Sequence, residues 1–247
     1  MIDIFTTAIY QPLYNGLIFL INIIPGGDVG IAVVLLTLIV KSILLPLTHK
    51  ATVSQAKMKK IEPEVKKLKE KYEKDKQQQA QKLMELYKTH NINPFAGCLP
   101  ILVQIPIILG LYFVFFKGIT TFDVALYSFI IFPENINMVS LGLVDMAGKS
   151  LILALIAGIS QYFQIKISMP TQQQTNKPAN TGKNKAIKDE MMKNLSFQMR
   201  YVLPIIVFVV SYNISAAVAL YWATSNIFSI THEHLVKRSQ KTPNTQV

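Results

Sequence analysis

Lys41 is the residue whose chemistry most needs an explanation, because it is a cation inside a long apolar stretch. It belongs to VGIAVVLLTLIVKSILLPL, residues 29–47, and Thr37 lies one helical turn before it. A lysine at the centre of a membrane helix costs about 2.5–3.5 kcal/mol on insertion scales and persists only with water, a partner or a route to the surface. Two interpretations stay open: Lys41 snorkels to the nearby interface, or it lies in a wet cavity and attracts an acidic group.

Amide and indole groups recur in the other apolar stretches. Gln104 lies in one stretch, Gln161 and Gln164 lie at helical spacing in another, and Trp222 and Asn226 lie one turn apart in the last. For any one of these residues alone, an interhelical hydrogen bond of about 0.6 kcal/mol is the simpler interpretation. The stretches hold no Asp or Glu that could neutralise the buried lysine, however, and this favours a shared wet interior with one positive charge.

Enzymatic chemistry has little support in the sequence. The apolar stretches hold no His, Asp or Glu for acid–base or metal chemistry, and GxSxG and Walker sequences are absent. His232 and His234 are separated by one residue, so on a helix they point apart and make a poor metal site. The single cysteine, Cys98, excludes an internal disulfide. We therefore expect no enzyme activity, no catalytic residue, no cofactor and no metal site.

The elements that must position these residues are membrane helices. Apolar residues make up 51% of the 247 residues and gather in long blocks with few charges. Residues 1–28 are apolar but interrupted by polar residues and proline, which favours an N-terminal amphipathic helix lying in the interface over a span. The start MIDIFTTAIY lacks the positive charge of a signal peptide, so we expect this end to stay on the mature chain.

The rest of the chain predicts an all-α integral membrane protein with five transmembrane helices. Residues 48–93 predict two helices that fold back as a lysine-rich hairpin. The last two spans are short for an ordinary bilayer, so either the turn between them dips into the headgroups or the bilayer thins locally. The predicted spans are 29–47, 94–117, 150–168, 200–214 and 215–232, and the other segments are the hairpin at 48–93, an extracytoplasmic segment at 118–149, a linker at 169–199 and a basic tail at 233–247.

The distribution of positive charge predicts the orientation. Lys and Arg number 25 against 14 Asp and Glu, giving a net charge of +11. Most of these cations fall in or beside the hairpin, the linker and the tail, whereas the 118–149 segment is poor in them. Cytoplasmic loops carry such an excess. We therefore expect the N-terminus outside and the C-terminus in the cytoplasm.

Three stretches resemble the YidC-type membrane protein insertases of the Oxa insertase superfamily. NINPFAGCLPILVQIPIILGLY is similar to their second span, LTLIVKSILLPLTHKATVSQAKMKKIEPEVKKLKEKY to their first span and cytoplasmic hairpin, and ALYWATSNIFSITHEHL to their last span. The resemblance covers nearly the whole chain and is to the short form without a large extracytoplasmic domain. It implies a five-helix core around a hydrophilic groove, open to cytoplasm and lipid, in the bacterial inner membrane.

The resemblance also implies site residues. In the family a cation of the first span receives substrate, and that position is Lys41 here, where the family usually has arginine. Lysine keeps the charge but loses the planar fork of donors. Gln104 and Trp222 match the glutamine and tryptophan that line the family's groove. The candidate substrate-binding residues are thus Lys41, Gln104 and Trp222, and the candidate groove-lining residues are Thr37, Gln161, Gln164, Ser225 and Asn226.

The expected function is insertion of nascent membrane proteins, whose hydrophobic segments and short polar flanks would pass from the cytoplasm through the groove into the bilayer. The other expected partners are a ribosome, through the basic hairpin and tail, a Sec translocon and anionic lipids, with no specific nucleic-acid sequence. Positive-inside topology is an alternative explanation of the basic segments. A passive assembly scaffold and, with less support, a small transporter are the alternative functions.

Overall fold

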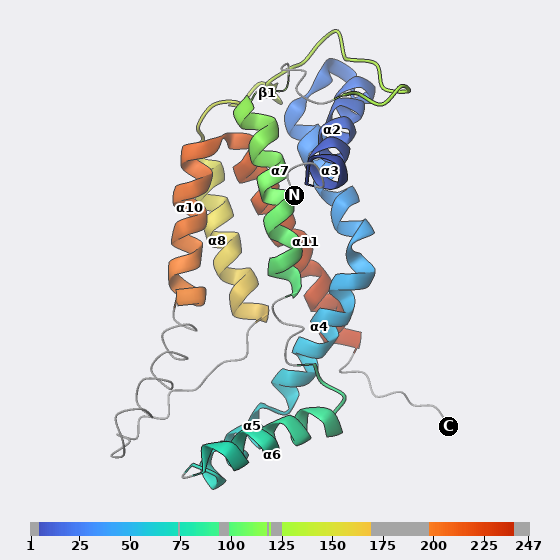
Figure 1. Ribbon diagram of the computed structural model, residues 1–247. Helices are drawn as coiled ribbons and strands as arrows, with labels where there is room; N and C mark the ends of the chain where they lie inside the picture. Colours follow the sequence, from blue (N-terminus) through green and yellow to red (C-terminus); the bar gives the residue numbers. More distant parts are fainter. Residues whose placement is uncertain are drawn as a thin grey trace.

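The computed structural model describes residues 5–73, 75–93, 99–117, 119, 125–168 and 198–239, and helices dominate these residues (Figure 1). The longer helices are α2 (Gln11–Ile23), α3 (Val29–Ile43), α4 (Leu45–Lys60), α5 (Glu62–Lys71), α6 (Lys76–Thr89), α7 (Leu99–Lys117), α8 (Leu151–Ser168), α10 (Leu203–Ile214) and α11 (Ala216–Ser239). The short elements are η1 (Thr6–Tyr10), η2 (Pro25–Gly27), η4 (Gln198–Val202) and an antiparallel pair of strands, β1 (Val139–Ser140) and β2 (Val144–Asp145). The predicted all-α class is confirmed.

Helix α11 forms the centre of the bundle. It packs against α8 on one side and α3 on the other, and α10 packs against both α8 and α11 (Figure 1). Its first turns are rich in alanine, and Ala216 and Ala217 are fully buried. These small side chains let neighbouring helices approach closely, which is how membrane helices associate. The core around them is formed mainly by Tyr14, Leu17, Ile18, Val29, Val33, Leu111, Val114 and Tyr221.

Helix α2 packs against α3 and α7, and several of its apolar side chains are fully buried. Its polar residue Asn15 is buried as well, because the side chain accepts a hydrogen bond from the Tyr127 backbone N–H at 2.8 Å and donates to the Gln11 carbonyl at 2.9 Å. In the sequence, Asn15 is one of the polar residues that favour an interfacial helix. In the structure, its side chain binds the distant loop that contains Tyr127. The depth of α2 in the membrane stays a prediction.

The stretch predicted as one span at 29–47 is bent in the structure. Helix α3 ends at Ile43, α4 begins at Leu45, and the two axes differ by 68°. Pro46 lies at the start of α4; in a continuous helix it would lack a backbone donor and its ring would collide with the carbonyl four residues earlier. The chain therefore turns at Leu44 and continues as α4 toward the hairpin (Figure 1).

The predicted hairpin contains three helical pieces rather than two. The end of α4 leads into α5, and α5 packs against α6 at the lower end of the molecule (Figure 1). The base is closed by Ser54 of α4, whose hydroxyl donates to the Asn93 carbonyl at 3.0 Å and accepts from the Asn93 N–H at 3.2 Å. This pair ties the two ends of the segment together across 39 residues.

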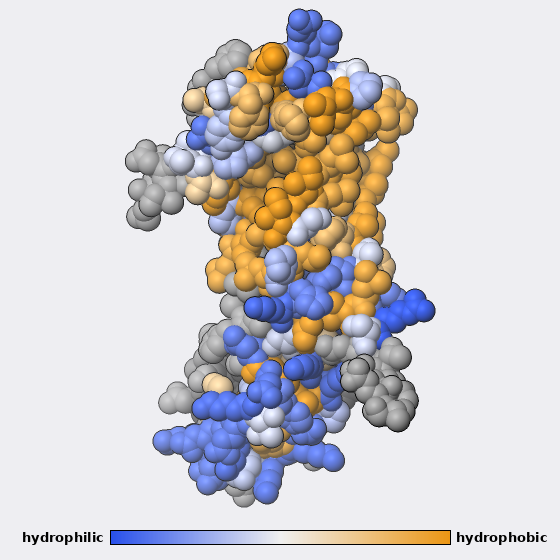
Figure 2. Space-filling model, turned by 90° about the vertical axis from the view of Figure 1, so that its right-hand side faces the viewer, coloured by the Kyte–Doolittle hydropathy of each residue, from blue (hydrophilic) through white to orange (hydrophobic). Residues whose placement is uncertain are grey.

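One described helix, Leu151–Ser168, is by itself long and apolar enough to cross a membrane, and the bent pair α3 and α4 also qualifies if it counts as one span. Leu102–Phe115 and Gln198–Ile214 are shorter apolar helices. On the face seen in Figure 2, hydrophobic residues dominate the middle of the molecule, the lower end is mostly hydrophilic and the upper end is mixed. The count of five spans stays a prediction.

The described part of the 118–149 segment covers the starts of α3 and α11. Asp28 caps α3 by accepting from the Ile31 N–H at 3.0 Å, and the same carboxylate accepts from the Ser140 hydroxyl at 2.7 Å and the Leu141 N–H at 2.8 Å. The Met146 carbonyl accepts from the N–H of the second residue of α11 at 3.1 Å. One loop thus joins the ends of two helices that are distant in sequence.

Candidate functional site

Lys41 reaches across the bundle from the last turn of α3. It is half-buried, and its Nζ donates to Gln104 Oε1 of α7 at 3.2 Å and to Ser229 Oγ of α11 at 3.4 Å. The Gln104 amide nitrogen in turn donates to the Tyr221 hydroxyl of α11. The lysine therefore turns toward two neighbouring helices, which fits the interior interpretation better than snorkelling. Its part in binding a substrate stays a prediction.

The partners of this ammonium group are neutral. In the ranges that the structure describes, no carboxylate forms an ion pair with Lys41. Glutamine and serine oxygens solvate a cation without neutralising it, so the charge of Lys41 remains among polar side chains of α3, α7 and α11. We call Lys41, Gln104, Tyr221 and Ser229 the cation cluster.

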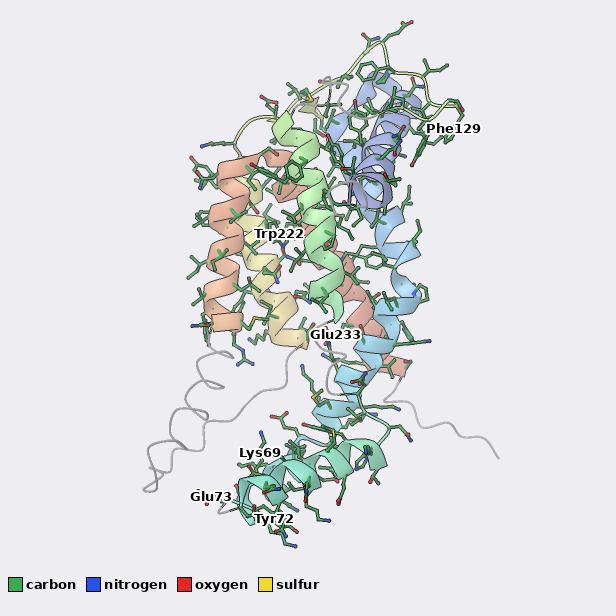
Figure 3. The ribbon with its side chains drawn as sticks, viewed as in Figure 1. Lys69, Tyr72, Glu73, Phe129, Trp222 and Glu233 are labelled. Carbon is green, nitrogen blue, oxygen red and sulfur yellow. The ribbon has the colours of Figure 1, made fainter. Side chains whose placement is uncertain are left out.

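A second polar network connects α8 and α11. The Trp222 indole N–H donates to Gln161 Oε1 at 3.1 Å, and the Gln161 amide nitrogen donates to Gln164 Oε1 at 3.3 Å. The Gln164 amide nitrogen then donates to the Ser168 hydroxyl at 3.2 Å. Figure 3 labels Trp222 in the middle of the bundle, beside α8. The structure therefore brings three of the predicted residues into one chain of hydrogen bonds, separate from the cation cluster.

Three predicted groove residues are buried between helices. Thr37 is 1% exposed and donates to the Val33 carbonyl of its own helix at 2.6 Å. Asn226 is 6% exposed and donates to the Ser160 hydroxyl of α8 at 3.1 Å, and Ser225 is 3% exposed. Of the three, Asn226 bonds a neighbouring helix, which matches the interhelical interpretation, whereas Thr37 bonds its own helix. Whether these residues line a groove stays a prediction.

A carboxylate that is not among the predicted site residues lies at the Ser168 end of this network. Glu233, labelled below Trp222 in Figure 3, is 5% exposed and accepts from the Ser168 hydroxyl. Its other oxygen forms an ion pair with Lys237 at 2.8 Å. The sequence places Glu233 one residue past a predicted span, and the i, i+4 spacing to Lys237 is the only local signal for the pair. We call Glu233, Lys237, Ser168 and Lys59 the basal cluster.

Two lysines of the basal cluster converge on the end of α8. Lys237 Nζ donates to the Ile167 carbonyl at 2.8 Å, and Lys59 Nζ of α4 donates to the same oxygen. Cations at a helix C-terminus satisfy free carbonyls and interact favourably with the helix dipole. Burial and the nearby Lys237 charge lower the pKa of Lys59 to about 8. The hairpin is thereby connected to α8 and α11.

Two apolar hollows lie along the α8–α11 face, away from the cation cluster. Their volumes are about 370 Å³ and 470 Å³. They share Ile167 and Ile230, so they form one continuous depression that reaches from the middle of α8 to the basal cluster. The remaining lining residues are Ile156, Ile159, Ser160 and Phe163 in the first hollow and Thr231, His234, Leu235 and Lys237 in the second.

Comparison with known proteins places the chain in one family. Residues 20–244 match the model of the family described as "60Kd inner membrane protein". The "Membrane protein insertase YidC" of Fusobacterium nucleatum is 34% identical over 93% of this chain and 97% of its own length, and that of Clostridium tetani is 33% identical over 88% and 85%. "Membrane protein insertase YidC 2" of Bacillus anthracis is 33% identical over 86% of this chain and 73% of its own length.

These matches span nearly all of the sequence that carries the two polar networks, and the relatives are named insertases rather than enzymes. The mainly helical fold, with the apolar band seen on the face in Figure 2, agrees with a protein of the bacterial inner membrane. The resemblance inferred from three sequence stretches is therefore confirmed, and the chain belongs to the YidC family of membrane protein insertases.

Proposed function

We propose that this protein inserts nascent membrane proteins and that the cation cluster receives the polar flank of the incoming segment. The observation that carries the proposal is the state of Lys41, whose ammonium group is held by neutral oxygens from α7 and α11 and by no carboxylate among the described residues. Such a site is solvated but not neutralised. An acidic flank gains an ion pair there that water alone does not provide.

The proposed mechanism needs no nucleotide. The insertase has its N-terminus outside and its C-terminus in the cytoplasm. A hydrophobic segment of the substrate approaches it from the cytoplasm. The cation cluster and the Trp222 network supply hydrogen bonds to the polar flank, which lowers the cost of moving it out of water. The apolar segment then leaves along the depression between α8 and α11, and burial of its apolar surface in lipid drives the step.

Five spans around a groove open to the cytoplasm are part of this proposal. The loop that ties Asp28 to Ser140 and Leu141 would close the outer side. The short helix α10 and the first turns of α11 meet at a tight break at Ser215, so a locally thinned bilayer would shorten the polar path. The extended α5–α6 hairpin, rich in lysine, is the proposed contact for a ribosome, a Sec translocon or anionic lipids.

Replacement of Lys41 tests the function. Lys41→Ala and Lys41→Glu are expected to reduce insertion of a substrate with an acidic flank about tenfold. Two opposite charges 4 Å apart attract each other with about 1 kcal/mol in water and about 4 kcal/mol at an intermediate dielectric. A tenfold effect corresponds to about 1.4 kcal/mol, which lies within this range. Lys41→Arg is expected to retain insertion. The measurement is protease protection of the translocated flank in proteoliposomes.

A matched control is Lys149→Ala, which removes an exposed cation just before α8, outside the hairpin and the cation cluster. It leaves the net charge equal to that of Lys41→Ala and should insert normally. A substrate with a neutral flank gives the second control, since it gains nothing from the charge. Equal insertion of the acidic-flank substrate by the wild type, Lys41→Ala and Lys41→Glu would refute the proposed role.

A passive assembly scaffold is the second candidate. The burial of Asn226 and Ser225 favours it, because side chains committed to helix packing do not help a substrate to cross. The same protease assay separates the two functions. A scaffold leaves the polar flank accessible from the side on which it was added, whereas an insertase moves it across the membrane.

A further inference from the structure

Two histidines face each other where α4 meets α11. His49 Nδ1 lies 3.1 Å from His232 Nε2, and the ring centroids are 5.3 Å apart. His49 is exposed and His232 is half-buried. The residues are 183 positions apart in sequence, so the pair exists only because the first and last membrane helices are neighbours. The proposed insertion path does not use them.

We propose that His49 and His232 form a binding site for a divalent transition metal of the zinc type. Imidazole nitrogens bind Zn²⁺ at about 2.0–2.1 Å, so two of them lie about 2.9 Å apart at a right angle and about 3.3 Å apart in a tetrahedron. The observed 3.1 Å lies between these values. Small adjustments of two side chains, one of them exposed, are enough to admit the ion.

The chemistry of the pair agrees with this assignment. A neutral imidazole has one nitrogen with a free lone pair, and the two nitrogens that face each other can both be in that form when the ring protons sit on the outer nitrogens. Imidazole is a preferred ligand for Zn²⁺, Ni²⁺ and Cu²⁺. Water would fill the other coordination positions, which the exposure of His49 permits.

Neighbouring groups do not complete or compete with the site. Glu233 follows His232 directly, but its oxygens are held by Lys237 and Ser168. His234 lines the hollow beside Ile167 and Ile230, on a different side of α11. A bound ion would cross-link α4 to α11 one helical turn from Ser229, the residue that holds Lys41.

The test is a calorimetric titration of the full chain with Zn²⁺, in detergent at neutral pH and without a histidine tag. About one equivalent is expected to bind. His49→Gln and His232→Gln are each expected to abolish this binding, because glutamine preserves a hydrogen bond but not an imidazole ligand. His234→Gln is the matched control, since it removes a histidine two residues from the site, and it should leave the affinity unchanged.

A second control addresses the other pair that holds a histidine. His90 Nε2 lies 3.3 Å from Glu64 Oε2 on the hairpin, and His90→Gln should also leave zinc binding unchanged. An affinity unaltered by His49→Gln, or abolished by His234→Gln or His90→Gln, would overturn the assignment. Absence of binding to the wild type would also overturn it and leave the pair as a hydrogen bond between α4 and α11.

A measurement on the wild type alone avoids dependence on variants that fold poorly. Diethyl pyrocarbonate modifies accessible imidazoles, and mass spectrometry locates the products. Zn²⁺ is expected to protect His49 and His232 and to leave the modification of His234 and His90 unchanged. Equal protection of all four, or of none, contradicts the proposal. Neither experiment requires an insertion assay, so the outcome is independent of the proposed function.

Discussion

Replacement of Asp28 is expected to destabilise the protein more than replacement of Asp145, a carboxylate in the neighbouring loop. Asp28 is 6% exposed, and its oxygens accept from the Ile31 N–H, the Ser140 hydroxyl and the Leu141 N–H. Leu141 has a positive φ of 52°, an uncommon backbone conformation for leucine, and the bond to Asp28 helps to hold it. One side chain thus supports a helix start and a strained turn.

The contributions give the size of the effect. Loss of a helix cap costs about 1 kcal/mol. A hydrogen bond from a buried hydroxyl to a charged group contributes about 1.5–3 kcal/mol, whereas the bond from the partly exposed Leu141 N–H is largely replaced by water. Asp28→Ala should therefore lower the free energy of unfolding by about 2.5–4 kcal/mol. At about 2–4 °C per kcal/mol for chains of this size, the midpoint should fall by roughly 10 °C.

The assay is thermal unfolding in detergent, with Asp145→Ala as the control. Asp145 lies in the same loop, is exposed, and accepts only from the exposed Ala147 N–H at 2.9 Å among the hydrogen bonds described for it, so its replacement should cost less than about 1 kcal/mol. Similar midpoints for the two variants would refute the assigned role of Asp28.

The pH dependence gives an independent check. Burial raises the pKa of Asp28, but the hydrogen bonds from Ile31, Ser140 and Leu141 outweigh it and hold the pKa below the ordinary value of 3.8. A carboxyl group whose folded-state pKa is lowered stabilises the protein above its unfolded-state pKa and loses that contribution as pH falls through the folded-state value. Asp28→Asn should remove the part of acid destabilisation that occurs below about pH 4.

Three further outcomes are expected. Gly158→Leu should destabilise the protein by about 1–3 kcal/mol in thermal unfolding, because even its Cβ would lie 3.0 Å from Phe208 Cβ. Glu233→Gln should lower the unfolding midpoint, since it leaves Lys237 without its ion-pair partner, whereas Glu85→Gln on the exposed hairpin should not. The pKa of Lys59 is lowered from 10.5 to about 8 in the folded protein, so the free energy of unfolding should increase as pH rises from 8 to 10.5. Lys59→Met should abolish this increase in a pH series of unfolding midpoints.

Local sequence patterns predicted the family, the helical class and the position of several helices. The apolar stretch at 150–168 corresponds to α8, which runs from Leu151 to Ser168. Such a helix depends on a continuous run of apolar residues, which one sequence displays directly. The bend at Leu44 was also encoded locally, in Pro46, but the length of the apolar run favoured a straight span.

Contacts between residues that are distant in the sequence could not be predicted from the sequence. Asn15 binds a loop more than 100 residues away, and Tyr221 joins the cation cluster from α11. Apolar periodicity says which face of a helix is buried but not which helix covers it. For the same reason the sequence could not tell that Thr37 and Asn226 differ from Gln104 in their surroundings. In the structure both are buried, Thr37 with a hydrogen bond within its own helix and Asn226 with one to α8.

The two clusters treat their positive charges differently, and this difference explains why Lys41 is the stronger candidate for recognition. Lys237 already has a carboxylate and a helix carbonyl as partners, so a visiting acid would have to replace an existing ion pair. Within the described part of the chain, Lys41 has hydrogen bonds of 3.2 and 3.4 Å to neutral groups and no ion pair. When a carboxylate displaces these groups, Lys41 gives up two long bonds to neutral oxygens and gains an ion pair. Gln104 keeps its contact with Tyr221 in this exchange, so no buried amide is left wholly unpaired.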